Sequence, residues 1–453
     1  MKRLLTVFLL LLGVADVAFA QAAPLRLTLD EAIARGIEAS HRLEELGARQ
    51  EAARAIEDQR EAAERPQLAV AAGYTRINHV DEFSVPNPGG GFRVLYPDLT
   101  NRVQSRIDLQ WSIYTGGRLQ ALTRAAGAEV DAAGQDREAA RADLKLEITR
   151  SFLAVTTARA SLDVVRQALE RTDAHLNDVR NQLSVGLVPP SDVLQIEAQQ
   201  AHQRMLSIEA ENIAETTSAE FKRLVGLEQG VAIELAADFE TRGQPGERGK
   251  VGTTNAMALV AQPANAVISD ARASRPERKS LLFRISAAEE RVAAASAGSL
   301  PALTAIAGYD MARPTLKNFP IQGKWEPSWD IGVSIRRMLF DGGRVRAETA
   351  EAAANQRATE ARLRDFDSVI EVEIRQRMAD LNSARASIEA ADAGVRAAME
   401  ARRVLAERFS AGVATNTDVL GAQTALLQAE LDLTRARANA ALAGARLDRA
   451  LGR

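Results

Sequence analysis

The chain has 453 residues, a formal net charge of −3, no cysteine and an aromatic content of only 4%. The absence of cysteine excludes disulfides, thiolate metal sites, a cysteine nucleophile and a lipid attached to an N-terminal cysteine. The slightly acidic balance argues against a nucleic-acid surface as a main function. Few aromatic rings and many alanines favour slender helix packing over a thick globular core.

The first twenty residues have the pattern of a secretory signal peptide. Lys2 and Arg3 precede an apolar run over residues 4–14, and Ala18-Phe19-Ala20 forms a small-x-small cleavage site. The run is shorter than the ~20 residues that a membrane-spanning helix needs. We therefore expect residues 1–20 to be a cleaved signal, and any place in a membrane to be taken by strands.

The first repeat, residues 21–227, is predicted to begin with a helix. Residues 28–64 have helical periodicity, Thr28 and Glu31 form a capping box, and Pro66 ends the pattern.

A β-hairpin is predicted over residues 66–115. The sequence alternates over residues 67–80 and again over 102–114, and a loop is expected over residues 81–101. The second strand has one apolar and one polar face. Its expected apolar face holds Ile107, Leu109, Trp111 and Ile113, and its polar face holds Asp108, Gln110, Ser112 and Tyr114.

A long helix is predicted after the turn at Gly116 and Gly117. Apolar residues recur every seven positions along it, which indicates a partner helix along its length. These residues are Ile148, Val155, Leu162, Leu169, Leu176 and Leu183, and between them lie Ser151, Ala158, Val165, Thr172 and Val179. About 67 residues would span roughly 100 Å as one helix.

The helix is expected to end in a tip turn over residues 184–191, followed by a return helix. Gly186 suits a left-handed C-terminal cap, two prolines cannot continue the incoming helix, and Ser191 can cap the next one. The first helix and the return helix together match the length of the long helix, so we expect them to stack end to end beside it.

The pattern occurs twice. A shift of 226 residues places Gly186 on Gly412 and Asp192 on Asp418, without a gap, and this is strong evidence for two copies of one unit. Residues 262–453 form the second repeat, with a helix, a hairpin over 301–341, a long helix, a tip turn over 410–417 and a return helix. Its strand-to-helix turn is expected at Gly342 and Gly343.

The second hairpin repeats the apolar face with Trp329, Ile331, Val333 and Ile335. Arg337 falls on the apolar side, where an arginine costs roughly 2–4 kcal/mol at the membrane midplane and about 0–1 kcal/mol near the interface. We therefore expect it at a strand end or after a bulge. Residues 228–261 match nothing in the other half and are predicted to be an inter-repeat linker that packs partly on the helices.

Four strands cannot close a barrel, and open strand edges are not tolerated in lipid. Three chains would give twelve strands around an aqueous interior. The apolar rows would then face lipid, and residues such as Asp108, Gln110, Asp330 and Ser334 would face water. The alternation alone also allows a soluble hairpin packed on helices; the signal peptide and the aromatic residues near the strands favour the membrane.

With these features, the chain resembles the TolC-type outer membrane efflux family over nearly all of the sequence after the signal. The resemblance rests on the two-copy layout, on residues 27–33, 66–68 and 339–344, and on the turns over 184–194 and 409–420. It implies a mixed α/β membrane protein, with four strands per chain and twelve in a trimer forming an outer membrane β-barrel joined to a long α-helical coiled-coil periplasmic barrel. It also implies a homotrimer that works with a periplasmic adaptor protein and an inner-membrane pump.

Asp192 and Asp418 lie at the starts of the two return helices. One interpretation is local, because an acidic residue in a first helical turn complements the helix dipole by about 0.3–1 kcal/mol. The other is a periplasmic constriction of six carboxylates in a trimer, which the resemblance supports at Asp418 in particular. Some relatives carry a second acid where Gly421 stands and a basic gate residue where Ala414 stands, so a strong charge-locked gate is not expected here.

The tip turns expose apolar residues, which either serve ordinary helix capping or form the surface for adaptor docking. They are Val185, Gly186 and Leu187 in the first copy and Ala411, Gly412 and Val413 in the second.

Catalytic, cofactor-binding and metal-binding residues are not expected. His41, His79, His175 and His202 lack metal spacing, and no nucleophile–base pattern occurs. The sequence therefore predicts a passive efflux duct that passes substrates from a periplasmic adaptor and inner-membrane pump to the exterior. A type I protein-secretion duct of the same fold and a structural coiled-coil protein of the envelope without a pore are the alternatives.

Overall fold

The computed structural model describes residues 24–236 and 263–453. The chain divides into two compact units. The described part of the sheet unit comprises residues 41–143, 263–380 and 446–453, and that of the hairpin unit comprises residues 24–40, 144–236 and 381–445. Two helices of 67 residues each, α3 (Arg118–Ser184) and α8 (Arg344–Ser410), contribute residues to both units.

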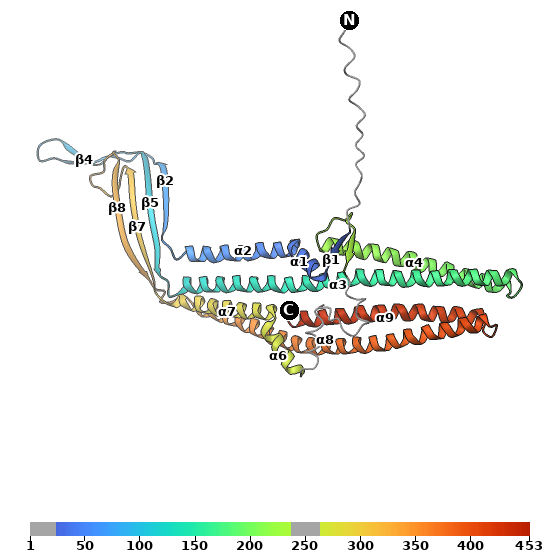
Figure 1. Cartoon of the computed structure of the whole chain (residues 1–453). Coiled ribbons are helices and arrows are strands. Elements are labelled where there is room, and N and C mark those ends of the chain that lie inside the picture. The colour runs from blue at the N-terminus through green and yellow to red at the C-terminus, as the bar shows by residue number, and fades with distance from the viewer. Residues whose placement is uncertain (1–23, 237–262) are drawn as a thin grey trace, which may run out of the picture. The chain divides into compact units, whose positions relative to one another are not determined.

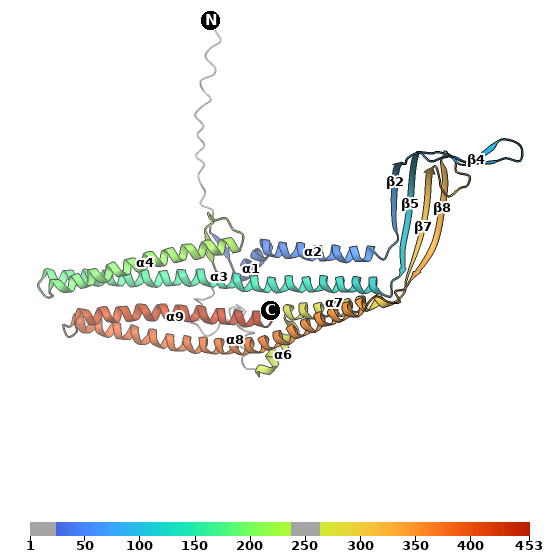
Figure 2. The same ribbon diagram turned by 180° about the vertical axis from the view of Figure 1, so that it is seen from behind.

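The sheet unit is built around one antiparallel sheet of four strands in the order β2-β5-β7-β8 (Figures 1 and 2). Among the described residues, the outer strands β2 and β8 therefore each have one free edge. The strands are β2 (Gln67–Arg76), β5 (Asn101–Tyr114), β7 (Ala302–Arg313) and β8 (Glu326–Arg336). Arg337 follows the last residue of β8 directly, as its charge predicted.

The segment between β2 and β5 is not a plain loop, which corrects the expectation for residues 81–101. It contains a second two-stranded sheet, β3 (Phe83–Pro86) paired with β4 (Phe92–Tyr96). Gly90 and Gly91 have φ values of 91° and 93°, and Asn87 N–H donates to the Gly91 carbonyl at 2.8 Å, which closes the turn. The proline and three glycines between the two short strands concealed the pairing.

Each long helix begins after a pair of glycines in the left-handed region. Gly116 and Gly117 precede α3, with φ values of 68° and 84°, and Gly342 and Gly343 precede α8. Before α8, the Asp341 carboxylate accepts hydrogen bonds from the Gly343 and Val345 N–H groups, both at 2.9 Å. These bonds satisfy free N–H groups at the helix start and lower the pKa of Asp341.

Shorter helices flank the long ones in the sheet unit. They are α2 (His41–Ala62), α6 (Ala264–Ser274), α7 (Pro276–Ser296) and the 3-10 turn η2 (Ala297–Ser299). The first helix expected over residues 28–64 is interrupted at Ala39–Ser40, and the corresponding helix of the second half is interrupted at Arg275. Arg275 is buried, where its Nε donates to the Ala450 carbonyl at 2.5 Å and its Nη2 pairs with Glu373 at 2.7 Å.

In the hairpin unit, α3 packs against α4 (Pro190–Leu224), and α8 is followed by its return helix α9 (Asn416–Ala450) (Figure 1). Side chains of both hairpins share one core, in which Leu176, Val179 and Ile196 are buried and Phe409 packs against them. The heptad stripe of α3 accordingly lies inside. Ile148, Val155, Leu162 and Leu176 are buried, with Ser151, Ala158, Val165, Thr172 and Val179 between them.

The start of the described chain joins this unit through β1 (Leu25–Leu27) and α1 (Leu29–Glu38). The capping box of α1 is confirmed: Glu31 N–H donates to Thr28 Oγ1 at 3.3 Å, and Thr28 N–H donates to the Glu31 carboxylate at 2.9 Å. β1 pairs in parallel with β6 (Ile233–Leu235), so the start of the expected linker adds a strand. Its remainder, and the expected signal over residues 1–20, lie outside the described residues. Within the described ranges, no helix combines the length and the apolar character that crossing a membrane requires.

Candidate functional site

The four-stranded sheet exposes one apolar and one polar face. Strand register aligns Leu109 with Ala307, and Ala307 with Ile331, in a row that crosses three strands. All the residues expected to face lipid are exposed in the chain, and Ile331 reaches 76%. They are Leu109, Trp111, Ile113, Trp329, Ile331, Val333 and Ile335.

A bulge near the end of β5 changes the expected pattern. Ser112 pairs with Thr304, but the next paired residue is Tyr114, opposite Leu303. Ile113 is the extra residue, and the register places Tyr114 on the apolar row rather than on the polar face. Alternation in the sequence cannot reveal a bulge, because its cause is the pairing with a strand nearly two hundred residues away.

The polar face carries an ion cluster that the sequence revealed only in part. Arg106 on β5 pairs with Asp108 at 2.5 Å, with Asp310 on β7 at 2.6 Å and with Asp330 on β8 at 3.1 Å. Lys317, from the β7–β8 loop, reaches Asp310 at 2.5 Å and Asp330 at 3.2 Å. We call these five residues the strand-face ion cluster.

Both tip turns close with the same hydrogen-bond pattern. Gly186 has a φ of 77°, Leu187 N–H donates to the Gln182 carbonyl at 3.0 Å, and Gly186 N–H donates to the Leu183 carbonyl at 2.9 Å. Gly412, with a φ of 71°, and Val413 repeat these bonds. This is the Schellman arrangement, which satisfies the last carbonyls of a helix and turns the next side chains outward.

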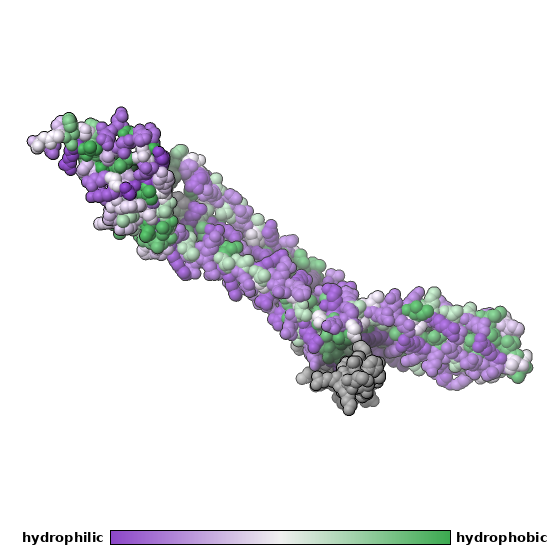
Figure 3. All heavy atoms as spheres, turned by 90° about the horizontal axis from the view of Figure 1, so that it is seen from above, coloured by the Kyte–Doolittle hydropathy of each residue, from purple (hydrophilic) through white to green (hydrophobic). Residues whose placement is uncertain are grey.

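The apolar side chains of the turns are consequently exposed, Leu187 at 75% and Val185 and Val413 to a similar degree. Hydrophobic side chains are also visible at this hairpin end in Figure 3.

Asp192 and Asp418 have different local surroundings although they occupy equivalent places in the two turns. Asp418 accepts hydrogen bonds from Thr415 Oγ1 at 2.7 Å and Thr415 N–H at 2.9 Å, and these bonds lower its pKa. It therefore completes a capping box at the start of α9. The N-cap of α4 is Pro189, which makes no side-chain cap, so the expectation that Ser191 caps this helix is wrong.

Polar side chains join the two hairpins just above the tips. Thr172 Oγ1 donates to Gln423 Oε1 at 3.3 Å, and a His175 ring nitrogen lies 2.9 Å from Asn416 Oδ1. Asn416 Nδ2 in turn donates to the Asp192 carbonyl at 3.2 Å. His175 is thus a packing residue between the hairpins, and its ring also lies edge-on to that of Phe409. The other partners were not anticipated, because they lie more than two hundred positions apart in sequence.

The comparison with protein families decides the identity. A model of the outer membrane efflux protein family matches residues 32–227 and 267–453, which is most of the chain. The chain belongs to the outer membrane efflux protein family. It is therefore an outer membrane efflux channel and not an enzyme.

Individual members of this efflux family agree with that assignment. The chain is 23% identical to outer membrane protein TolC of Escherichia coli over 404 residues, which cover 85% of this chain and 74% of TolC. It is 25% identical to protein CyaE of Bordetella pertussis over 323 residues, covering 71% and 65% of the two chains.

Solved structures share the fold. VceC of Vibrio cholerae, an outer membrane protein, has a TM-score of 0.75 at 21% identity, with 94% of this chain and 96% of that chain covered. A membrane protein from Pseudomonas aeruginosa has a TM-score of 0.76 at 21% identity, covering 93% and 92%. At this identity the similarity concerns the fold alone.

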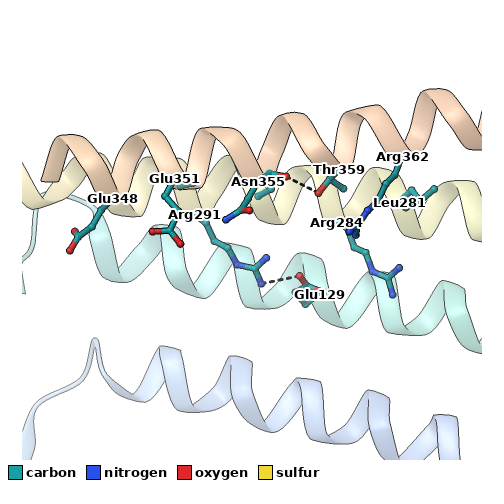
Figure 4. A pocket seen from close by; sticks show the side chains of 11 residues that line it. Glu129, Leu281, Arg284, Arg291, Glu348, Glu351, Asn355, Thr359 and Arg362 are labelled. Carbon is teal, nitrogen blue, oxygen red and sulfur yellow. Dashed lines mark hydrogen bonds and ion pairs between the residues drawn. The ribbon is translucent and has the colours of Figure 1, made fainter. Parts of the chain in front are cut away.

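The efflux channel also has a cleft of about 390 Å³ in its sheet unit, between α3, α7 and α8 (Figure 4). Glu129 on α3 pairs with Arg291 on α7 at 2.9 Å, while Glu348, Glu351 and Arg362 line the cleft from α8. Positive and negative groups are mixed and partly paired, so the lining does not favour a ligand of either charge. We assign no binding role to it.

Proposed function

We propose that three copies of the chain close a twelve-stranded barrel in the outer membrane and a helical tunnel in the periplasm. The observation that carries the proposal is the pair of free edges on β2 and β8. Unpaired backbone groups at a strand edge are not tolerated in lipid, and pairing β8 of one copy with β2 of the next removes every such edge. Twelve strands are enough for an aqueous interior.

The two faces of the sheet support this arrangement. An exposed apolar face with tryptophans at positions 111 and 329 suits outer membrane lipid. The polar face, with Asp108 and Asp330, would line the water-filled interior. In such a barrel the alternating side chains of each strand face lipid on the outside and water on the inside.

The two-repeat organisation belongs to the same proposal. The repeats would comprise residues 21–227 and 262–453, joined by the linker over 228–261. Equal lengths support it: α3 and α8 have 67 residues each, and α4 and α9 have 35 residues each. The helices would extend into the periplasm.

The hairpin tips would dock a periplasmic adaptor protein, which connects the channel to an inner-membrane pump. The proposed contact residues are Val185, Gly186, Leu187, Ala411, Gly412 and Val413. Their apolar members are exposed on rigid, hydrogen-bonded turns, and exposed apolar patches usually mark contact surfaces.

We also propose that Asp192 and Asp418 form a periplasmic constriction in the trimer. Six carboxylates near a narrow end would favour cations and resist anions. The capping role of Asp418 is compatible with this role, because its side chain remains exposed. The substitution Asp418→Ala should reduce the cation preference of the channel; unchanged conductance and selectivity would leave helix capping as its only role.

Chemical cross-linking can test the closed trimer cleanly, because the natural chain has no cysteine. A Val70→Cys/Val333→Cys double variant places one thiol on each free-edge strand. A short bis-maleimide should convert it to covalent trimers on a denaturing gel, whereas each single variant should stay monomeric because equivalent strands of different copies are not neighbours. Monomers from the double variant would contradict the proposal.

Planar-bilayer recordings separate the pore from its alternatives. The purified trimer should conduct ions, whereas a structural coiled-coil protein of the envelope should not. A type I protein-secretion duct would conduct as well, and the similarity to CyaE keeps it a candidate. A deletion strain complemented with this gene distinguishes the two: efflux predicts restored tolerance to small toxic molecules, and secretion predicts a restored exported protein.

A further inference from the structure

The strand-face ion cluster holds more carboxylates than cations. Two adjacent rows of the polar face contain Asp108, Asp310 and Asp330, with Arg106 as the one cation among the strand residues of these rows. Lys317 reaches the same carboxylates from the loop. The cluster therefore combines three negative with two positive charges, and its near-neutrality depends on each cation.

Gly308 shows that the chain leaves room for Arg106 to cross a strand. It lies on β7 between Asp108 and Asp330 in the register. A Cβ atom at this position would collide with the Arg106 guanidinium group. The guanidinium thus passes over the bare backbone of β7 to reach Asp330 on β8, where its Nη1 and Nη2 lie 3.1 and 3.2 Å from the two carboxylate oxygens.

The exposure of the cluster indicates that its charges act on water and ions beside it. The Arg106 side chain is about one-third exposed, and those of Asp108 and Asp330 are exposed somewhat more. An ion pair in that setting contributes little to stability. A ring of charged side chains around a pore, by contrast, sets which ions pass.

We infer that Arg106 is a specificity-determining residue of the channel: it neutralises an acidic band on the inner face of the strands and so limits the preference for cations. This inference rests on the proposed trimeric barrel, in which the polar face lines the interior. The band would then contain nine carboxylates, three from each copy, with three copies each of Arg106 and Lys317.

Reversal potentials in a KCl gradient across a planar bilayer test the inference. Arg106→Gln should raise the ratio of K⁺ to Cl⁻ permeability about twofold or more. Asp330→Asn removes a carboxylate from the same cluster and should lower the ratio. Opposite signs are the decisive readout, because loss of a purely structural clamp would not shift selectivity in opposite directions.

Arg93→Gln serves as the matched control. Arg93 lies exposed on β4 outside the four-stranded sheet, so the same charge change should leave the reversal potential unchanged. Each variant is first checked for a wild-type helical spectrum and trimer mass. If Arg106→Gln does not assemble, Arg106→Lys replaces it, because lysine keeps the charge but loses the planar fork. Arg106→Lys should assemble with little change in the permeability ratio, while Asp330→Asn should still lower that ratio.

The outcomes are distinct. A conducting wild type with no shift in Arg106→Gln, or shifts of the same sign in Arg106→Gln and Asp330→Asn, overturns the role of Arg106 and leaves the duct intact. A wild-type trimer that never conducts overturns the proposed pore itself.

Discussion

The long helices α3 and α8 have equal length, but the chain covers their apolar surfaces to different extents. Val155 of α3 is 0% exposed, and α3, which the structure describes from end to end, has no exposed large hydrophobic side chain. In α8, Val372 is 66% exposed, and Val369 and Met399 are exposed as well. The first helix finds its partners within the chain, while the second leaves apolar side chains such as Val372 exposed for a neighbouring copy to cover.

The contacts of the two helices explain the difference. In the hairpin unit, Leu176 and Val179 of α3 pack with α4 and with Phe409 of the other hairpin. In the sheet unit, α8 is held to α7 by ion pairs such as Arg278–Asp367 at 2.7 Å. Within α8, Ile370 and Ile374 are fully buried, while Val369 and Val372 stay exposed in the chain.

The largest effect is expected from Val155→Asp in α3. An unpaired carboxylate would be buried where the chain leaves no exposed surface, which should cost more than about 4 kcal/mol and prevent stable folding. Urea unfolding in detergent, followed by helical circular dichroism, measures this loss. Gln167→Asp, at an exposed position of the same helix, should change stability by less than about 0.5 kcal/mol. Similar stability of the two variants would show that Val155 of α3 is not buried in the folded chain.

The counterpart in α8, Val372→Asp, should leave the fold of the chain intact and weaken the trimer. The side chain is already exposed in the single chain, so the carboxylate is desolvated only when a second copy covers it. Light scattering of the detergent-solubilised protein should show lost trimer mass with an unchanged helical spectrum. Asn382→Asp, an exposed polar position of α8, is the control. A Val372→Asp trimer as stable as the wild type would show that this face is not an interface.

Features determined by nearby residues could be predicted from the sequence. The seven-residue repeat of α3, the alternation around Trp329 and the glycine pairs before the long helices all depend on neighbours within a few positions. Their residues occupy the buried stripe, the exposed apolar face and the left-handed turns. The candidate tips were recognisable for the same reason, because Gly186 and Gly412 end a helix by local hydrogen bonds.

Features determined by distant partners could not be predicted. The interruption at Arg275 has a local cause, because Pro276 follows it and disfavours a helical conformation at the preceding residue. The bond from the Arg275 side chain to the Ala450 carbonyl, 175 positions away, could not be predicted. Arg106 reads as an ordinary polar strand residue, and its partners Asp310 and Asp330 lie 204 and 224 positions away. Gly308 offers the one available signal, because a glycine inside a strand often marks a close approach by another group.

A smaller effect is expected where the two hairpins meet. Asn416 is 3% exposed and bonds both His175 and the Asp192 carbonyl. Asn416→Ala should cost about 1–3 kcal/mol, because it leaves polar groups of the first hairpin without partners. The urea midpoint should fall, with an unchanged slope, whereas Thr417→Ala at the neighbouring exposed position should have little effect. Equal urea midpoints for the two variants would show that the polar contacts of Asn416 do not help to join the hairpins.

The smallest effect distinguishes the starts of α4 and α9. Thr415 lowers the pKa of Asp418 below its usual value near 3.8, so the ionised cap stabilises α9 above that pH and is lost as the pH falls through the lower, folded-state pKa. Hydrogen exchange of the first turn of α9 should therefore lose protection on acidification, and Asp418→Asn should remove this pH dependence. The start of α4 has Pro189 at its N-cap and no side-chain cap, so Asp192→Asn should change the exchange of its first turn less than Asp418→Asn changes that of α9. An equal response at both starts would mean that the asymmetry between the two capping sites does not persist in solution.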